Sequence, residues 1–216
     1  MNNWTNVDDL GSGILVYRNN VKKDLQIIKR LTEILKDDPN QYPSWQPAYV
    51  GYRELMPDYR DCNDFKFKKT DLIDNSPYVK ELGDIWQDCY DPQKLAVDDY
   101  CKKYNIMELR YWEAFNFIRY KPGQHFMEHH DHGFSYNCTL SLVTYLNDDF
   151  KGGELFFRLQ GITYVPKEGD TVIFPSNFMY PHQALPVIEG IKYSLVTMLD
   201  YSDKFHKPEF YSESGS

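Results

Sequence analysis

The feature that most constrains the fold is a series of short apolar or alternating segments from about residue 107 to residue 200. Turn sequences such as Lys121-Pro122-Gly123 and Gly152-Gly153 separate them. Several short strands between regularly spaced turns are typical of a sandwich or barrel. The expected strands are 109–120, 125–131, 141–146, 154–158, 162–165, 171–174, 180–185 and 191–199. The pattern predicts a mainly β chain with flanking helices, built on a double-stranded β-helix (jelly-roll) core.

Residues 1–106 have a different pattern, in which helical spacing dominates. A short strand at 13–18 precedes a helix that is expected to begin at Asn19 or Asn20, with apolar residues at helical spacing as far as Leu35. We therefore expect a single domain in three parts. These are a mixed α/β support region (1–106), the jelly-roll core (107–201) and a tail (202–216).

Two further helices are expected after Ser76-Pro77 and Asp91-Pro92, since each pair places a capping residue before a first-turn proline. Residues 51–75 between these regions are polar and aromatic without a clear period, which predicts an excursion over the surface. This segment, with Arg53, Arg60 and Phe65, is a candidate substrate lid, and ordinary packing is an equal alternative.

Composition limits the classes of function. The chain is 42% hydrophobic and 26% charged, which is ordinary for a globular domain, and it contains no apolar run of membrane-spanning length. Its start lacks the basic and apolar segments of a signal peptide, so a soluble cytoplasmic protein is expected. The four cysteines show no CxxC spacing and are expected to be reduced. The formal charge of −8 argues against nucleic-acid binding.

The histidines give the most specific signal. His129 and Asp131 are two residues apart, so in an extended strand they point to the same side. His182 is the best candidate for a third ligand from elsewhere. Two imidazoles and one carboxylate leave coordination positions open, which suits non-haem iron(II) that also binds a cosubstrate and dioxygen. The other histidines of this stretch, His125, His130 and His132, are expected to play no catalytic part, and alternation predicts that His130 faces away from the metal.

The surrounding motifs appear in a characteristic order: Tyr120-Lys-Pro-Gly-Gln, His129-x-Asp131, Tyr145-Leu-Asn, Gly152-Gly-Glu, Pro166-x-x-Gly-Asp, His182 and Lys192-Tyr193. Over about residues 109–200 the chain resembles the iron(II)- and 2-oxoglutarate-dependent dioxygenases, within them the prolyl 4-hydroxylase-like branch. The resemblance implies that His129, Asp131 and His182 form the iron triad. It also implies that Lys192 binds the distal carboxylate of 2-oxoglutarate.

The resemblance assigns Tyr120 and Tyr145 to the cosubstrate pocket, with Ser194 as a weaker match. Alternation along the last strand places Lys192, Ser194, Val196 and Met198 on one side, so the lysine is expected to point inward. Burying an ammonium group costs free energy unless an anion lies next to it, and an anionic ligand would provide that anion. The alternative for the tyrosines is ordinary core packing, in a chain with 18 tyrosines.

The reaction implied by the resemblance couples oxidative decarboxylation of 2-oxoglutarate by dioxygen to hydroxylation of a C–H bond. The expected substrate is a peptidyl proline, by analogy to the branch, and ascorbate is an expected reductant that binds at the enzyme. A free amino acid or small metabolite is the alternative substrate. A non-catalytic jelly-roll module with a structural metal is the alternative from another class, which the intact ligands and Lys192 disfavour.

Overall fold

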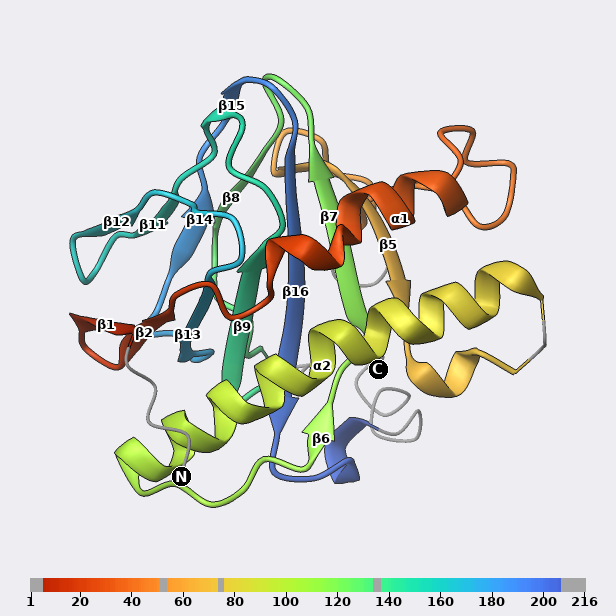
Figure 1. Ribbon diagram of the computed structural model, residues 1–216. Coiled ribbons are helices and arrows are strands. Elements are labelled where there is room, and N and C mark those ends of the chain that lie inside the picture. Colours follow the sequence, from red (N-terminus) through yellow and green to blue (C-terminus); the bar gives the residue numbers. More distant parts are fainter. Residues whose placement is uncertain (1–5, 51–53, 74–75, 134–136, 207–216) are drawn as a thin grey trace, which may run out of the picture.

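The structure is a computed structural model that describes residues 6–50, 54–73, 76–133 and 137–206. Within these residues two β-sheets pack together, and two α-helices lie across the outer side of the larger sheet (Figure 1). The predicted mainly β architecture with helices along one side is therefore confirmed. Each of the eight segments predicted as core strands contains a strand.

Nine strands of the described residues form the larger sheet. In spatial order they are β1 (Val7–Gly11), β2 (Ile14–Tyr17), β13 (Thr171–Pro175), β9 (Leu140–Tyr145), β16 (Lys192–Asp200), β7 (Phe115–Tyr120), β5 (Asn63–Phe67) and β3 (Gln46–Pro47), and β6 (Tyr111–Trp112) pairs with β16. The N-terminal region thus supplies strands at both edges of this sheet. The proposed division of the chain at residue 106 stays a prediction.

Five strands form the smaller sheet, and two more form a separate ribbon. The sheet runs β12 (Ile162–Tyr164), β11 (Leu155–Phe157), β14 (His182–Ala184), β8 (His125–His129) and β4 (Arg60–Asp61), and the ribbon pairs β10 (Lys151–Gly152) with β15 (Val187–Glu189). A buried cluster joins the two sheets through Leu155 and Phe157 of β11 and Val143 and Val172 of the larger sheet.

The helices of the described residues are η1 (Lys23–Leu25), α1 (Ile27–Ile34), η2 (Lys69–Asp71), α2 (Pro77–Tyr104) and η3 (Lys204–His206). Helix α1 begins later than Asn19 or Asn20, so that prediction was wrong. The backbone N–H of Asn19 donates to Asp170 and that of Val21 donates to Gly169, and both bonds tie this segment to the turn before β13. Gln26 then takes a left-handed conformation, and the α-helix starts after it.

The two helices predicted after Pro77 and Pro92 are one helix, α2, with Pro92 inside it. A proline in a helix interior costs about 3 kcal/mol because it removes one hydrogen bond and crowds the preceding turn. Burial on both sides of Pro92 offsets this cost. Ile85 and Cys89 pack into one buried cluster, and Ala96 and Val97 pack into a second.

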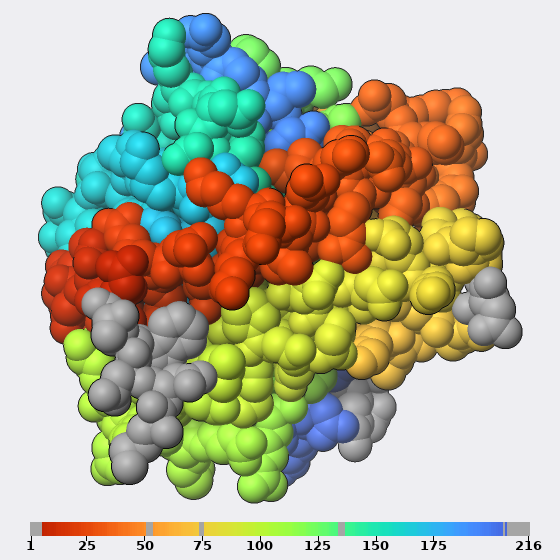
Figure 2. Space-filling view, in the orientation of Figure 1, coloured from red at the N-terminus to blue at the C-terminus, as the bar shows by residue number. Residues whose placement is uncertain are grey.

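Helices α1 and α2 lie side by side and cover one side of the larger sheet (Figures 1 and 2). Phe117 and Leu195, directly opposite each other on β7 and β16, belong to the buried cluster beneath them. Gln93 of α2 donates to the hydroxyl of Thr144 at 2.9 Å. Because side chains alternate along a strand, the intervening residues face the smaller sheet, where a cavity lies.

The predicted surface excursion over 51–75 was wrong for its described central part. Strand β4 pairs with β8 of the smaller sheet and β5 pairs with β7 of the larger sheet, so the segment joins the two sheets. Phe65 lies in the cluster beneath the helices and not at the cavity. Arg53 lies outside the described residues.

The structure also bears on the remaining expectations about the chain. Cys62, Cys89, Cys101 and Cys138 are all buried and free, as expected. Among the described residues, no helix has the length and apolar character needed to cross a bilayer.

Candidate active site

A cavity of about 1040 Å³ lies between the two sheets. The smaller sheet contributes His129 and His182 to its lining, the segment just after β8 contributes Asp131, and the larger sheet contributes Lys192 and Tyr145. Residues far apart in the sequence therefore meet here, because the strands that carry them face each other across the cavity.

The three predicted metal ligands come together. His129 ends β8 and His182 begins β14, and the two residues are directly opposite in this antiparallel pair. The ligand atoms of these histidines and of Asp131 all lie within 4.8 Å of one another. Nε2 of His129 is 3.6 Å from Oδ1 of Asp131, and Nε2 of His182 is 3.7 Å from Oδ2.

Backbone contacts orient both imidazoles. Nδ1 of His129 lies 2.8 Å from the carbonyl oxygen of Met127, and Nδ1 of His182 lies 3.0 Å from that of Tyr180. Each Nδ1 therefore carries the proton and donates it, which leaves the Nε2 lone pairs directed at a common point. Burial, followed by the neighbouring His182, lowers the pKa of His129 to about 3. The imidazole is therefore neutral, as a metal ligand must be.

Two serines support the carboxylate, and the sequence did not identify this role. Ser141 Oγ donates to Asp131 Oδ2 at 2.5 Å, and Ser176 Oγ lies 2.7 Å from Ser141 Oγ. Burial raises the pKa of Asp131, but the two histidines and this hydroxyl outweigh it and bring the pKa below its usual value. Alternation along β9 groups Ser141 with Tyr145, but the contact to Asp131 depends on how the sheets meet.

A β-bulge in β8 adds an aromatic support that alternation does not predict. Along the β8–β14 pair, His129 is opposite His182 and Phe126 is opposite Ala184, so one extra residue is present in β8. The bulge turns Phe126 to the side of His129, and the two rings stack with centroids 3.6 Å apart. The guanidinium carbon of Arg60 lies 4.9 Å from the centroid of the Phe126 ring.

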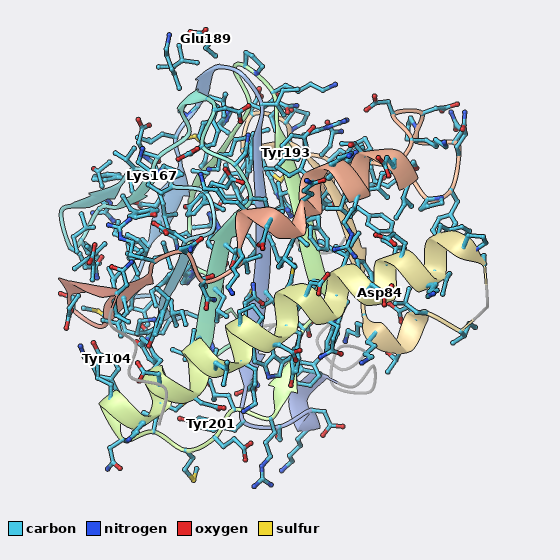
Figure 3. All side chains as sticks on the ribbon, in the orientation of Figure 1. Asp84, Tyr104, Lys167, Glu189, Tyr193 and Tyr201 are labelled. Carbon is cyan, nitrogen blue, oxygen red and sulfur yellow. The ribbon has the colours of Figure 1, made fainter. Side chains whose placement is uncertain are left out.

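Lys192 is buried in the cavity wall, as its position on the last strand predicts. Its side chain is surrounded by the rings of Tyr120 and Tyr145, with Nζ 4.9 Å and 5.5 Å from their centroids. Nζ donates to the carbonyl oxygen of Gly153 at 2.7 Å. Burial lowers the pKa of Lys192 to about 7. Tyr193, labelled in Figure 3, is on the opposite, helix-covered side of β16.

Steric constraints explain why glycines occupy positions 152 and 153 beside this lysine. Both glycines have positive φ angles, and a Cβ on Gly152 would lie 2.4 Å from the carbonyl oxygen of Pro186. A Cβ on Gly153 would approach the Lys192 side chain to 3.0 Å. The turn therefore brings its backbone carbonyl against the lysine only if neither residue carries a side chain.

The tyrosines and Ser194 also line the cavity. Ser194 is directly opposite Tyr145, and Lys192 is directly opposite Tyr120. The hydroxyl of Tyr145 is buried and has no hydrogen-bond partner among the described residues. An unpaired buried hydroxyl next to a buried ammonium is suited to an anionic acceptor such as a carboxylate.

The other histidines do not join the triad. The imidazole of His125 approaches the backbone carbonyls of Gly123 and Asp58, and that of His132 contacts the backbone of Cys138. His130 is exposed and lies among the residues that line the cavity, and its expected orientation away from the metal stays a prediction. The chain turns after β8 ends, and strand alternation no longer applies there.

The donor set fits the metal that the sequence suggests. Two neutral imidazoles and one carboxylate on the same side of a metal are typical of non-haem iron(II) sites with open positions. The buried lysine and the unpaired tyrosine hydroxyl fit an anionic cosubstrate in the same cavity. The arrangement of the site therefore fits oxygenase chemistry.

Comparisons with known proteins agree with this chemistry. Residues 115–199 match the sequence model of the 2OG-Fe(II) oxygenase superfamily. A candidate prolyl 4-hydroxylase of Acanthamoeba polyphaga mimivirus is 24% identical over 178 residues, which cover 73% of each chain. The procollagen-lysine,2-oxoglutarate 5-dioxygenase 1 of Mus musculus is 31% identical over 87 residues, but these are 38% of this chain and 12% of that protein.

Solved structures share the fold. The prolyl hydroxylase of Trichoplax adhaerens, solved with a peptide fragment of the hypoxia inducible factor oxygen degradation domain, superposes with a TM-score of 0.67 at 12% identity. The match covers 94% of this chain and 88% of that one. A Pseudomonas putida prolyl-4-hydroxylase gives 0.61 at 20% identity and covers 87% and 92%. The predicted jelly-roll core is thereby confirmed.

The fold and the site together define a 2-oxoglutarate-dependent dioxygenase, an oxidoreductase. The match over residues 115–199 and the relatives and structural neighbours named above support a 2OG-Fe(II) oxygenase that is similar to prolyl 4-hydroxylases. The resemblance drawn from its motifs is confirmed at this level.

Proposed function

We propose that the protein hydroxylates prolyl residues in peptide or protein substrates. The observation that carries the proposal is that one cavity presents a His-Asp-His cluster on the smaller sheet and a buried lysine on the larger sheet. The relatives and structural neighbours named as prolyl hydroxylases supply the substrate class.

In this proposal His129, Asp131 and His182 hold iron(II) through two Nε2 atoms and a carboxylate oxygen. When bound, iron(II) with 2-oxoglutarate supplies the activation of dioxygen and the transfer of one oxygen atom to a C–H bond. The chain keeps both imidazoles neutral and oriented through the carbonyls of Met127 and Tyr180. Its Ser141 hydroxyl donates to the Asp131 carboxylate and aligns it, and the two histidines together with this hydroxyl lower the pKa of that carboxylate.

Lys192 binds the distal carboxylate of 2-oxoglutarate in this proposal, and Tyr145, Tyr120 and Ser194 line the space around that carboxylate. The ammonium and the unpaired Tyr145 hydroxyl together offer charge-assisted hydrogen bonds in a site shielded from water. Binding of the carboxylate also offsets the cost of burying the lysine cation.

The size of the cavity favours a segment of chain over a free amino acid as substrate. Pockets of about 300–1,000 Å³ enclose a drug-sized ligand, and 2-oxoglutarate is much smaller than that. The cavity of about 1040 Å³ therefore leaves room for a residue with its neighbours. The net charge of −8 agrees with a peptide and not a nucleic acid as partner. Ascorbate as reductant and a cytoplasmic location are parts of this proposal.

Two experiments test the proposal. Anaerobic addition of iron(II) and 2-oxoglutarate to the folded protein should produce a visible charge-transfer absorption band, and its absence would contradict the dioxygenase assignment. After aerobic turnover, mass spectrometry of proline-rich peptides should show a gain of one oxygen atom on proline. Oxygen gained by free proline or another small molecule, with no change in the peptides, would support the alternative substrate.

A further inference from the structure

Asn116 is a buried polar residue of the cavity that the proposed iron and 2-oxoglutarate sites do not use. It is 7% exposed and lines the cavity from β7. Its Oδ1 atom is buried and has no hydrogen-bond partner among the described residues. A buried acceptor without a donor costs about 1–3 kcal/mol, so its presence in a cavity wall points to a ligand that supplies the donor.

The strand register places Asn116 between the cosubstrate end and the metal end of the cavity. Lys192 is opposite Tyr120, and Val196, four residues further along β16, is opposite Asn116. Met198, two residues beyond Val196, is opposite Ser141, the residue that donates to Asp131. Asn116 therefore lies on the larger sheet at a level between the lysine and the metal ligands, facing the smaller sheet.

The hydrogen-bonding groups of the Asn116 amide distinguish between the two ligands expected in this part of the cavity, 2-oxoglutarate and a peptide. 2-Oxoglutarate is a dianion that carries acceptors and no donor, so it leaves Oδ1 unpaired. A peptide group offers both an N–H donor and a C=O acceptor, which match the two halves of the Asn116 amide. Proline itself lacks an N–H, so the donor belongs to a neighbouring residue of the substrate.

We infer that Asn116 is a substrate-binding residue whose Oδ1 accepts a backbone N–H from a residue next to the hydroxylated proline. This inference rests on the proposed function and narrows it. The substrate is then a chain with a free amide hydrogen beside the target residue, and an all-imide chain such as polyproline is a poor ligand.

The test compares two peptides that differ in that hydrogen. One consists of Pro-Pro-Gly repeats, and the other has N-methylglycine in place of each glycine. Binding is measured by calorimetry on Mn(II)-loaded protein with 2-oxoglutarate under anaerobic conditions, so that no turnover occurs. The wild-type protein should bind the unmethylated peptide about tenfold more tightly, as expected when a buried acceptor loses its donor.

Asn116→Leu should bind the two peptides equally, and Asn116→Asp, which keeps an acceptor, should retain the preference. Removing an unpaired buried polar atom does not weaken packing, so the leucine variant should unfold at the same or a higher temperature. Its affinity for 2-oxoglutarate should be unchanged. Asn40→Leu, at an exposed turn, is the control and should match the wild type.

The outcomes separate the two proposals. Equal binding of both peptides by the wild type, or a preference that survives in Asn116→Leu, would overturn the role of Asn116 and leave prolyl hydroxylation standing. Failure of the wild type to bind either peptide would overturn both the Asn116 role and the peptidyl-proline substrate.

Discussion

At the scale of single residues, the site combines groups whose ordinary chemistry the fold alters. Lys192 shows this best, because burial among Tyr120 and Tyr145 brings its pKa to about 7. The cation is stable there only if an acceptor is close, and the carbonyl of Gly153 provides part of that. An anionic cosubstrate would provide the rest, which makes its affinity dependent on the protonation of this lysine.

Lys192 therefore predicts a pH dependence of 2-oxoglutarate binding. The lysine must be protonated to bind a carboxylate, so affinity should be highest below pH 7 and fall up to about tenfold per pH unit above it. Lys192→Met should bind 10- to 100-fold more weakly, with no pH dependence in this range. The measurement is a titration of Mn(II)-loaded protein. The control is Lys167→Met, at an exposed lysine that is labelled in Figure 3, and this variant should behave as the wild type. A pH dependence of 2-oxoglutarate affinity that persists in Lys192→Met would contradict the role of Lys192 in binding the carboxylate.

Ser141 predicts an effect on the metal. Its hydroxyl orients the Asp131 carboxylate, and loss of such a supporting hydrogen bond lowers metal affinity about 10- to 100-fold. Ser141→Ala should show this in a Co(II) titration followed by visible absorption. The exposed Ser202→Ala serves as the control. Unchanged Co(II) affinity in Ser141→Ala would show that the serine does not support the ligand.

At the scale of elements, tertiary packing decides where helices and strands begin and end. Helix α2 continues through Pro92 because buried residues on both sides of the proline fix it to the larger sheet. Strand β8 carries a bulge that places Phe126 against His129. In both cases the local preference is known from the sequence, and contacts with distant residues override it.

Helix α2 gives a stability prediction. Ile85 is a fully buried residue of α2, so Ile85→Ala should lower the free energy of unfolding by about 2–5 kcal/mol. Asp84, the exposed neighbour labelled in Figure 3, is the control, and Asp84→Ala should change it by less than about 0.5 kcal/mol. Urea unfolding followed by circular dichroism measures both. Equal effects of the two substitutions would show that this turn of α2 is not packed against the sheet.

At the scale of the whole molecule, two sheets contribute different chemistry to one cavity. The smaller sheet presents the His-Asp-His cluster, and the larger sheet presents Lys192, Tyr145 and Asn116. The segment that carries β4 and β5 joins the two sheets, and Arg60 of β4 lines the cavity. Ligands that contact both sheets should therefore increase the free energy of unfolding of the whole domain.

Ligand loading predicts a shift in thermal stability. At concentrations about 100-fold above the dissociation constant, a ligand that binds only the folded state adds about 2.7 kcal/mol. For a chain of this length, Mn(II) with 2-oxoglutarate should raise the midpoint of thermal unfolding by about 5–10 °C, and a chelator should reverse the shift. His129→Ala should abolish it. A shift of the same size in that variant would place the stabilising metal elsewhere.

Much of this protein follows from its sequence alone. The short strands and turns predict the β core, because alternation and turn chemistry are local properties. The His129-x-Asp131 spacing keeps two candidate ligands close along the chain, although Asp131 lies just beyond the end of β8. The positions of Lys192 and Ser194 on the last strand put both on the cavity side.

Other features depend on the tertiary structure, because they arise from contacts between residues far apart in the chain. The continuity of α2, the late start of α1 and the strands within 51–75 all follow from packing and hydrogen bonds to distant elements. The bulge at Phe126 and the unpaired Oδ1 atom of Asn116 also arise from such distant contacts. Strand alternation can assign a side chain to a face, but only the register between strands decides what it meets there.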